Sequence, residues 1–117
     1  MSSAKKPTYE FGVLCETISC NFLRLKGYTI IAQRYKSKLG EIDIIAKKDK
    51  TVVFIEVKAR KKEELLEITL RQKQVNRIRK AAQFFIATHP QYHNFDMRFD
   101  FILFTTNLIP QHFEAFF

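Results

Sequence analysis

The segment GEIDIIAKKDKTVVFIEVKAR, from Gly40 to Arg60, decides the fold of this chain. Its apolar residues predict two strands, at about 41–47 and 51–59, joined by a polar hairpin turn at KKDK. Ionisable residues nevertheless lie inside both strands: Glu41, Asp43, Glu56 and Lys58. Because ionised side chains are costly to bury without partners, these residues need either an exposed face or a shared ligand.

The segments on either side of this hairpin complete an α-β-β-β-α-β order. Apolar residues recur at helical spacing over about 8–25 and again over about 68–87. Segments rich in β-branched and aromatic residues predict further strands at 28–36 and 98–105. Strands that follow one another closely favour an antiparallel meander, and a long helix can carry the chain to a parallel fourth strand. We therefore expect an α/β fold with a mixed sheet of four to five strands flanked by helices.

Length, charge and the start of the chain restrict the class of protein. With 117 residues the chain suits a single domain, 1–117, with a loose basic tail at 1–7. It has no apolar run long enough to cross a bilayer and no signal-peptide segment at its start. We therefore expect a cytoplasmic protein that is not embedded in a membrane. The formal net charge of +8 favours a polyanionic partner such as nucleic acid, although an anionic membrane surface or simple solubility would also explain it.

Side-chain alternation can bring part of the charged set together on the sheet. Glu56 and Lys58 share one face of their strand, as Glu41 and Asp43 do on the preceding strand. The hairpin can therefore place Asp43 beside Glu56 and Lys58, while the opposite side, Ile42 included, is apolar and suits the main core. Two close carboxylates repel each other unless a cation is present, and Mg²⁺ is usually held by one or two carboxylates. Lys58 could then serve an attacking water or neutralise charge developing on a phosphate.

An exposed, salt-bridged face is the alternative explanation of the same residues. Lys58 would then simply pair with Glu56 or Asp43, as charged residues on half-buried strands commonly do. Spacing alone leaves the two interpretations about equally open. The three histidines have no carboxylate at ligand spacing, and we expect them to be incidental.

The wider pattern of motifs resembles a known family. Asp43, followed by Glu56-Val57-Lys58, is similar to the D…ExK core of restriction-endonuclease-like nucleases. The likeness continues along the chain with GxxxET around Glu16, KGY at 26–28, GEIDIIA at 40–46, FIEVKAR at 54–60, RQK at 71–73 and RFD at 98–100. From about Phe11 to Phe117 the chain resembles the YraN-like family of small bacterial proteins, assigned to that nuclease superfamily and compared with archaeal Holliday-junction resolvases.

The resemblance implies a restriction-endonuclease-like α-β-β-β-α-β core and a metal-dependent nuclease. Asp43 and Glu56 would hold Mg²⁺ or Mn²⁺, and Val57 between Glu56 and the lysine is counted with the metal ligands. Lys58 would be the catalytic amine. The set Asp43, Glu56 and Lys58 is thus the predicted catalytic centre.

Two further acids are candidates for this centre. Glu16 lies on the first helix, flanked by apolar neighbours, and in similar resolvases an acid on the first helix approaches the metal site. The alternative is a carboxylate at the edge of a dimer or partner surface. Glu41, two residues before Asp43, could support a metal ligand through water, or it could simply pair with a lysine.

Basic residues indicate where nucleic acid would lie. Lys73, Arg77 and Lys80 are spaced to line one side of the second helix, and Arg60 and Lys61 extend the charge beyond the strand that carries the metal ligands. Such residues would contact phosphates without reading the base sequence. For Arg77 and Lys80 a solvated helix face is an equally open interpretation.

The sequence therefore predicts a DNA endonuclease that acts on branched, Holliday-junction-like or single-stranded DNA in DNA processing or recombination. One alternative is a catalytically latent DNA-binding subunit on the same fold that works with a partner such as a helicase. Another is an RNA nuclease. A homodimer is a further hypothesis, because junction nucleases commonly need two active sites. The terminal Phe113, Phe116 and Phe117 would either pack on their own core or dock a second subunit.

Overall fold

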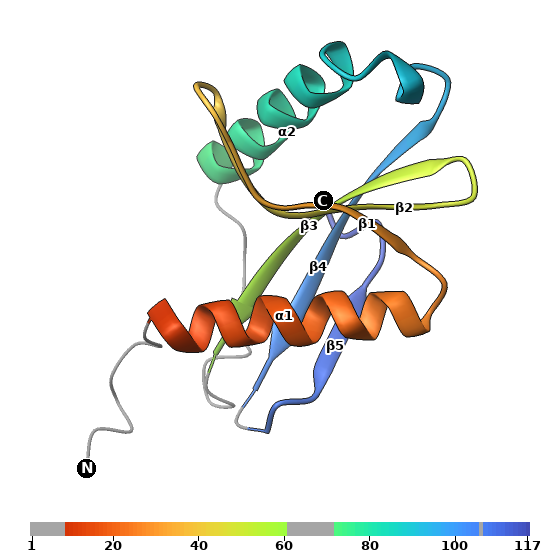
Figure 1. Cartoon of the computed structure of the whole chain (residues 1–117). Coiled ribbons are helices and arrows are strands. Elements are labelled where there is room, and N and C mark those ends of the chain that lie inside the picture. Colours follow the sequence, from red (N-terminus) through yellow and green to blue (C-terminus); the bar gives the residue numbers. More distant parts are fainter. Residues whose placement is uncertain (1–8, 61–71, 106) are drawn as a thin grey trace.

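The computed structural model describes residues 9–60, 72–105 and 107–117. Its helices and strands follow the expected order, with a further strand at the C-terminal end (Figure 1). They are α1 (Tyr9–Leu25), β1 (Thr29–Ser37), β2 (Gly40–Lys48), β3 (Thr51–Ala59), α2 (Gln72–Ala87), a 3-10 turn (Pro90–Tyr92), β4 (Asp96–Phe104) and β5 (Pro110–Phe113). The expected tail at 1–7 and the expected start of the second helix at 68–71 lie outside the described residues. Within the described ranges, neither helix has the length and apolar character needed to span a bilayer.

The strands form one mixed sheet in the order β1-β2-β3-β4-β5. Neighbouring strands are antiparallel except β3 and β4, which run parallel with Phe54 opposite Phe99. α2 lies in the connection between these two parallel strands, on one side of the sheet, and α1 lies on the other side (Figure 1). The predicted α/β fold, its antiparallel meander and its parallel fourth strand are confirmed.

The sheet has a hydrophobic core on each side, whereas the strand pattern predicted one main core. The core beneath α1 contains Ile44, Ala46, Val53 and Ile55. The core beneath α2 contains Ile42, Ile45, Val52, Phe54, Ile78 and Phe85. The prediction that Ile42 shares a side with Ile44 is therefore wrong. β2 is paired with β3 only from Ile44 onward, and the strand before this point follows β1 instead, so its twist turns Ile42 toward α2.

α1 packs on the sheet through the stripe that contains Cys20 and Leu23. Both side chains are fully buried, whereas Leu14 and Leu25 are exposed. Glu16 belongs to the same inward stripe, and only 15% of its side chain is exposed. Helical spacing alone could not decide which stripe faces the sheet. The packing directs Glu16 toward the sheet rather than toward a partner surface.

A buried polar network joins the end of α1 to β4 and β5. The fully buried Asp100 accepts hydrogen bonds from Arg98 Nε at 2.9 Å, from Arg98 Nη2 at 2.8 Å and from His112 Nε2 at 2.7 Å. Arg98 Nη2 also donates to the Tyr28 hydroxyl at 2.6 Å. Lys26 Nζ lies 2.7 Å from His112 Nδ1, and because an ammonium group can only donate, Nδ1 accepts and Nε2 carries the proton. His112 is therefore part of a buried network and not incidental.

The terminal phenylalanines pack on their own chain. Phe116 stacks on Phe101 with ring centroids 4.8 Å apart, and Phe117 lies 5.5 Å from the ring of Phe99. Phe113 and Phe116 nevertheless remain 39% and 40% exposed. The docking of a second subunit on these exposed parts stays a prediction.

Candidate functional site

Asp43 lies at the point where β2 separates from β3. The paired residues of these strands reach from Lys48–Thr51 to Ile44–Ile55 and end there. Beyond this point the backbone N–H of Val57 donates to Asp43 Oδ2 at 2.8 Å, so a side chain replaces the missing strand partner. This hydrogen bond fixes the carboxylate at the fork between the two strands.

Glu56 is buried next to this fork and has partners from two elements. Its side chain faces α2, where Gln74 Nε2 donates to Glu56 Oε2 at 2.6 Å. Lys58 Nζ lies 3.4 Å from the same oxygen, and the carboxyl groups of Glu56 and Asp43 are close enough to share a proton. The structure thus brings together the three side chains of the predicted centre, Asp43, Glu56 and Lys58.

The two carboxyl groups disfavour each other's charge. Burial raises the pKa of Glu56 to about 8, and the negative charge of Asp43 adds to this effect while Lys58 opposes it. Burial also raises the pKa of Asp43, against the hydrogen bond from Val57 and the positive charge of Lys58. Because the pKa of both acids is raised, a bound cation would stabilise their ionised forms.

Glu16 approaches the same pair from α1. Burial raises the pKa of its carboxyl group, and the charge of Asp43 raises it further, which places Glu16 within electrostatic reach of the fork. Glu16 Oε1 is buried, and no residue in the described ranges donates a hydrogen bond to it. A buried oxygen without a donor is costly, so this atom also favours a cation or a water near Asp43.

The donor atoms at the fork fit a hard divalent cation. Across the described ranges, no three His, Cys, Asp or Glu side chains gather closely enough to form a complete protein cage for a metal. Mg²⁺ does not require one, because it is commonly bound by one or two carboxylates and keeps several waters. Asp43 and Glu56 would supply those carboxylates. The Val57 carbonyl lies on the same side of β3 as its N–H, facing the fork, where it could add a neutral oxygen.

Comparison of the sequence with known proteins shows which family this chain belongs to. Residues 15–104 match the model of the Uncharacterised protein family UPF0102. The chain belongs to the UPF0102 family. A UPF0102 protein of Rhodopseudomonas palustris strain BisB5 is 38% identical over 93% of this chain and 83% of its own length. A UPF0102 protein of Bradyrhizobium diazoefficiens is 35% identical over 99% of this chain and 87% of its own length. UPF0102 is the YraN family that the motif pattern indicated.

Glu41 is the predicted site residue that this UPF0102 structure leaves apart. It lies opposite Lys36 of β1, and its side chain is exposed and forms no hydrogen bond or ion pair with any other described residue. Sequence alternation placed Glu41 on the same face as Asp43, but β2 is no longer paired with β3 beyond Ile44, and Glu41 follows β1 instead. The geometry gives no support to Glu41 as part of the site.

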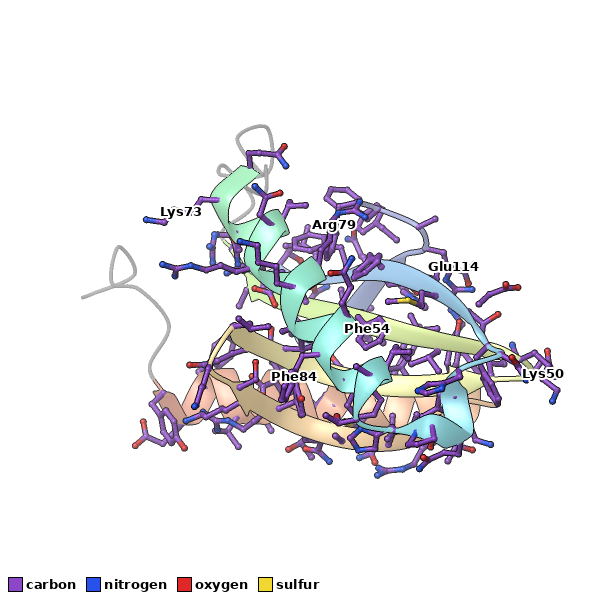
Figure 2. All side chains as sticks on the ribbon, turned by 90° about the horizontal axis from the view of Figure 1, so that it is seen from above. Lys50, Phe54, Lys73, Arg79, Phe84 and Glu114 are labelled. Atoms are coloured by element: carbon purple, nitrogen blue, oxygen red, sulfur yellow. The ribbon has the colours of Figure 1, made fainter. Side chains whose placement is uncertain are left out.

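The predicted nucleic-acid contacts lie on the surface of the UPF0102 chain. Lys73, Arg77 and Lys80 are exposed on α2, and Lys73 points away from the sheet at the start of the helix (Figure 2). A Cβ atom added to Gly40 would lie 2.9 Å from the Arg77 carbonyl oxygen, so the β1–β2 turn packs closely on this helix. Arg60 is exposed and donates to the carbonyl of Ala59. Lys61 lies outside the described residues.

Two residues near the centre of this UPF0102 site were missed by sequence reasoning. Gln74 precedes Ile78 by one helical turn and so shares its inward face, which is a signal that the spacing contained. Arg34 of β1 has its Nε 3.9 Å from Glu16 Oε1, and no motif distinguished it from the other basic residues.

The raised pKa of Glu56 predicts how stability depends on pH in this UPF0102 protein without metal. An acid with a folded-state pKa of about 8 binds its proton more tightly in the folded than in the unfolded chain, where the pKa is about 4.3. Stability is therefore expected to fall as the pH rises through this interval. The melting temperature should drop by ~4 °C or more between about pH 5.5 and pH 9.

The Glu56→Gln variant keeps an acceptor for Gln74 and removes the charge. Its melting curve is expected to change less with pH than that of the wild type. Mn²⁺ should raise the wild-type melting temperature more at the higher pH, because protons compete with the metal for the carboxylates. Equal pH dependence in the two proteins would contradict the raised pKa of Glu56.

Proposed function

We propose that this protein is a Mg²⁺- or Mn²⁺-dependent endonuclease that hydrolyses phosphodiester bonds in DNA, preferentially at branched, Holliday-junction-like or single-stranded structures. The observation that carries the proposal is the convergence of Asp43, Glu56 and Lys58 at the fork between β2 and β3. A mere salt-bridged surface would be exposed, whereas Glu56 is only 7% exposed.

Each residue has a task that its contacts support. Asp43 and Glu56 would hold the cation, which when bound polarises a phosphate oxygen and lowers the pKa of a water. Asp43 is oriented by the Val57 N–H, and Glu56 is oriented by Gln74. Lys58 Nζ, 3.4 Å from Glu56 and partly exposed, can orient the attacking water, accept its proton after losing its own, or neutralise charge on the phosphate.

Nucleic acid is the substrate class that the surrounding charge supports. The chain has a net charge of +8, and exposed Lys73 and Arg77 lie on the helix that also carries Gln74. Contacts of this kind bind the phosphate backbone and make affinity dependent on salt. A role in DNA processing or recombination would follow from the proposed preference for branched DNA.

The test is a cleavage assay with a charge-matched control. End-labelled four-way junctions, flaps, linear duplexes, single strands and RNA counterparts are incubated with Mg²⁺, with Mn²⁺ or with a chelator. We expect cleavage that requires the metal, and we expect Lys58→Ala to slow it by about a hundredfold or more. Lys50→Ala, which removes the same charge from the β2–β3 turn at the other end of β3, should leave the rate unchanged. Equal rates for Lys58→Ala and wild type would refute the proposed mechanism.

The catalytically latent DNA-binding subunit is the second candidate. The observation that favours it is that Glu56 already has Gln74 and Lys58 as partners without a metal. In this case the isolated wild-type protein would bind branched DNA without cutting it. Cleavage that appears only when a partner such as a helicase is added would support this candidate.

A further inference from the structure

Arg34 has an unusual backbone conformation beside the candidate site. Its φ is +53°, in the left-handed region that L residues with a side chain rarely adopt. The other described non-glycine residues with positive φ are Asp49, in the β2–β3 turn, and Ala115, after β5, whereas Arg34 lies within a strand. Strained backbone within a regular element is typical of functional positions.

The strand register places Arg34 level with Asp43. The flanking pairs Gln33–Ile44 and Tyr35–Ile42 leave these two residues opposite each other on β1 and β2. The Arg34 charge lowers the pKa of both Asp43 and Glu16, against the larger effect of their burial. Arg34 is thus a cation that approaches Asp43 from β1, whereas Lys58 approaches from β3 on the other side of β2.

The guanidinium group has hydrogen-bonding capacity that no described residue uses. Its Nε lies 3.9 Å from Glu16 Oε1, which is beyond hydrogen-bond length, and no acceptor in the described ranges receives a hydrogen bond from it. Its Cζ lies 4.7 Å from the centroid of the Tyr9 ring, which supports the group from one side. The side chain is 37% exposed, and none of its five N–H donors is taken by a residue of the described ranges.

We propose that Arg34 is a phosphate-binding residue of this site, which donates to the oxygens of the phosphodiester bound beside Asp43. A planar guanidinium binds phosphate through two parallel hydrogen bonds. A phosphate would thus accept the hydrogen bonds that Arg34 does not donate to Glu16. A simple counter-ion for Glu16 would be expected to contact it directly and would not need a strained backbone. The inference rests on the proposed function and adds to it the group that holds the substrate.

The test compares Arg34→Gly with Arg24→Ala by fluorescence anisotropy on labelled branched DNA. Ca²⁺ replaces Mg²⁺ so that binding is measured without cleavage. Arg34→Gly is expected to weaken metal-dependent affinity by roughly tenfold, and Arg34→Lys should recover only part of it. Arg24→Ala removes an exposed arginine at the far end of α1 and should change the affinity by less than about threefold.

Thermal unfolding separates a substrate-binding role from a structural one. Glycine adopts positive φ without strain, so Arg34→Gly is expected to be at least as stable as the wild type. If Arg34→Gly were less stable than the wild type but bound DNA with the same affinity, the inference would be overturned. Arg34 would then be only a counter-ion for the acids. A wild type that binds none of the substrates would overturn it as well.

The inference and the proposed function can fail separately. Metal-dependent cleavage by the wild type together with unchanged affinity of Arg34→Gly would overturn only the role of Arg34. A tenfold affinity loss in Arg34→Gly with no cleavage by the wild type would leave Arg34 as a phosphate contact and overturn only the hydrolysis.

Discussion

Replacing Asp43 with asparagine is expected to lower the rate of metal-dependent DNA cleavage by more than about a hundredfold, because loss of a group that merely orients a metal ligand already costs 10–100-fold. The amide oxygen of asparagine can still accept the hydrogen bond that Val57 donates to Asp43 at 2.8 Å. The substitution therefore removes the negative charge and keeps the local geometry. Single-turnover cleavage and Mn²⁺ titration by calorimetry measure the two parts of the effect.

Glu41→Gln is the matched control for this variant. It removes one carboxylate charge two residues away on the same strand, where the side chain is exposed. We expect cleavage and Mn²⁺ affinity close to those of the wild type. If Asp43→Asn bound Mn²⁺ as tightly as Glu41→Gln does, Asp43 would not be a metal ligand.

The second large effect is expected at Asp100 of β4, which lies opposite Ile55 of β3. Asp100→Asn should lower the free energy of unfolding by about 3 kcal/mol, because it leaves the partly buried Arg98 guanidinium without its counter-charge. Asp100 accepts from two nitrogens of Arg98, from His112 Nε2 and from the backbone N–H of Ala115, all within 2.7–2.9 Å. An asparagine offers one oxygen to these donors and presents an NH₂ group to the rest. Urea unfolding at neutral pH measures the difference.

The pH dependence of this difference gives an independent check. Burial opposes ionisation, but the hydrogen bonds from His112, Arg98 and Ala115 prevail and lower the pKa of Asp100 to about 2. Because the folded-state value lies below the unfolded value of about 3.9, the contribution of Asp100 is complete above about pH 4 and is lost as the pH falls toward 2. Asp96→Asn, at an exposed position of the same strand, should leave the free energy of unfolding nearly unchanged at every pH. Similar unfolding curves for the two variants would contradict the assigned role of the network.

Local patterns predicted most of the fold and the centre of the site. Alternation in the hairpin predicted that Asp43, Glu56 and Lys58 lie together, and Asp43 stays near Glu56 because it is the first residue beyond the last β2–β3 pair. The path of β2 beyond Ile44 was not predictable in this way, since it depends on where the strand stops pairing with β3. Ile42 was misplaced for this reason.

The remaining differences arise from contacts between segments far apart in the sequence. β5 has only four residues and begins with Pro110, so no alternation could identify it. Its partner β4 and the end of α1 give His112 its role, through Asp100 and Lys26. In the sequence alone, the motifs KGY and RFD are recognisable only as family markers. In the structure they meet, because Arg98 donates to the hydroxyl of Tyr28.

The irregular backbone of β1 also bears on how the molecule avoids self-association. β1 and β5 are the outer strands of the sheet, and unpaired strand edges can act as templates for aggregation. The register shift between Ile30 and Ala32 and the left-handed Arg34 interrupt the row of free backbone groups on one edge. On the other edge β5 is short and starts with a proline that has no N–H to donate. The conformation that directs Arg34 toward the acids thus also blunts an edge that could otherwise recruit strands from other chains.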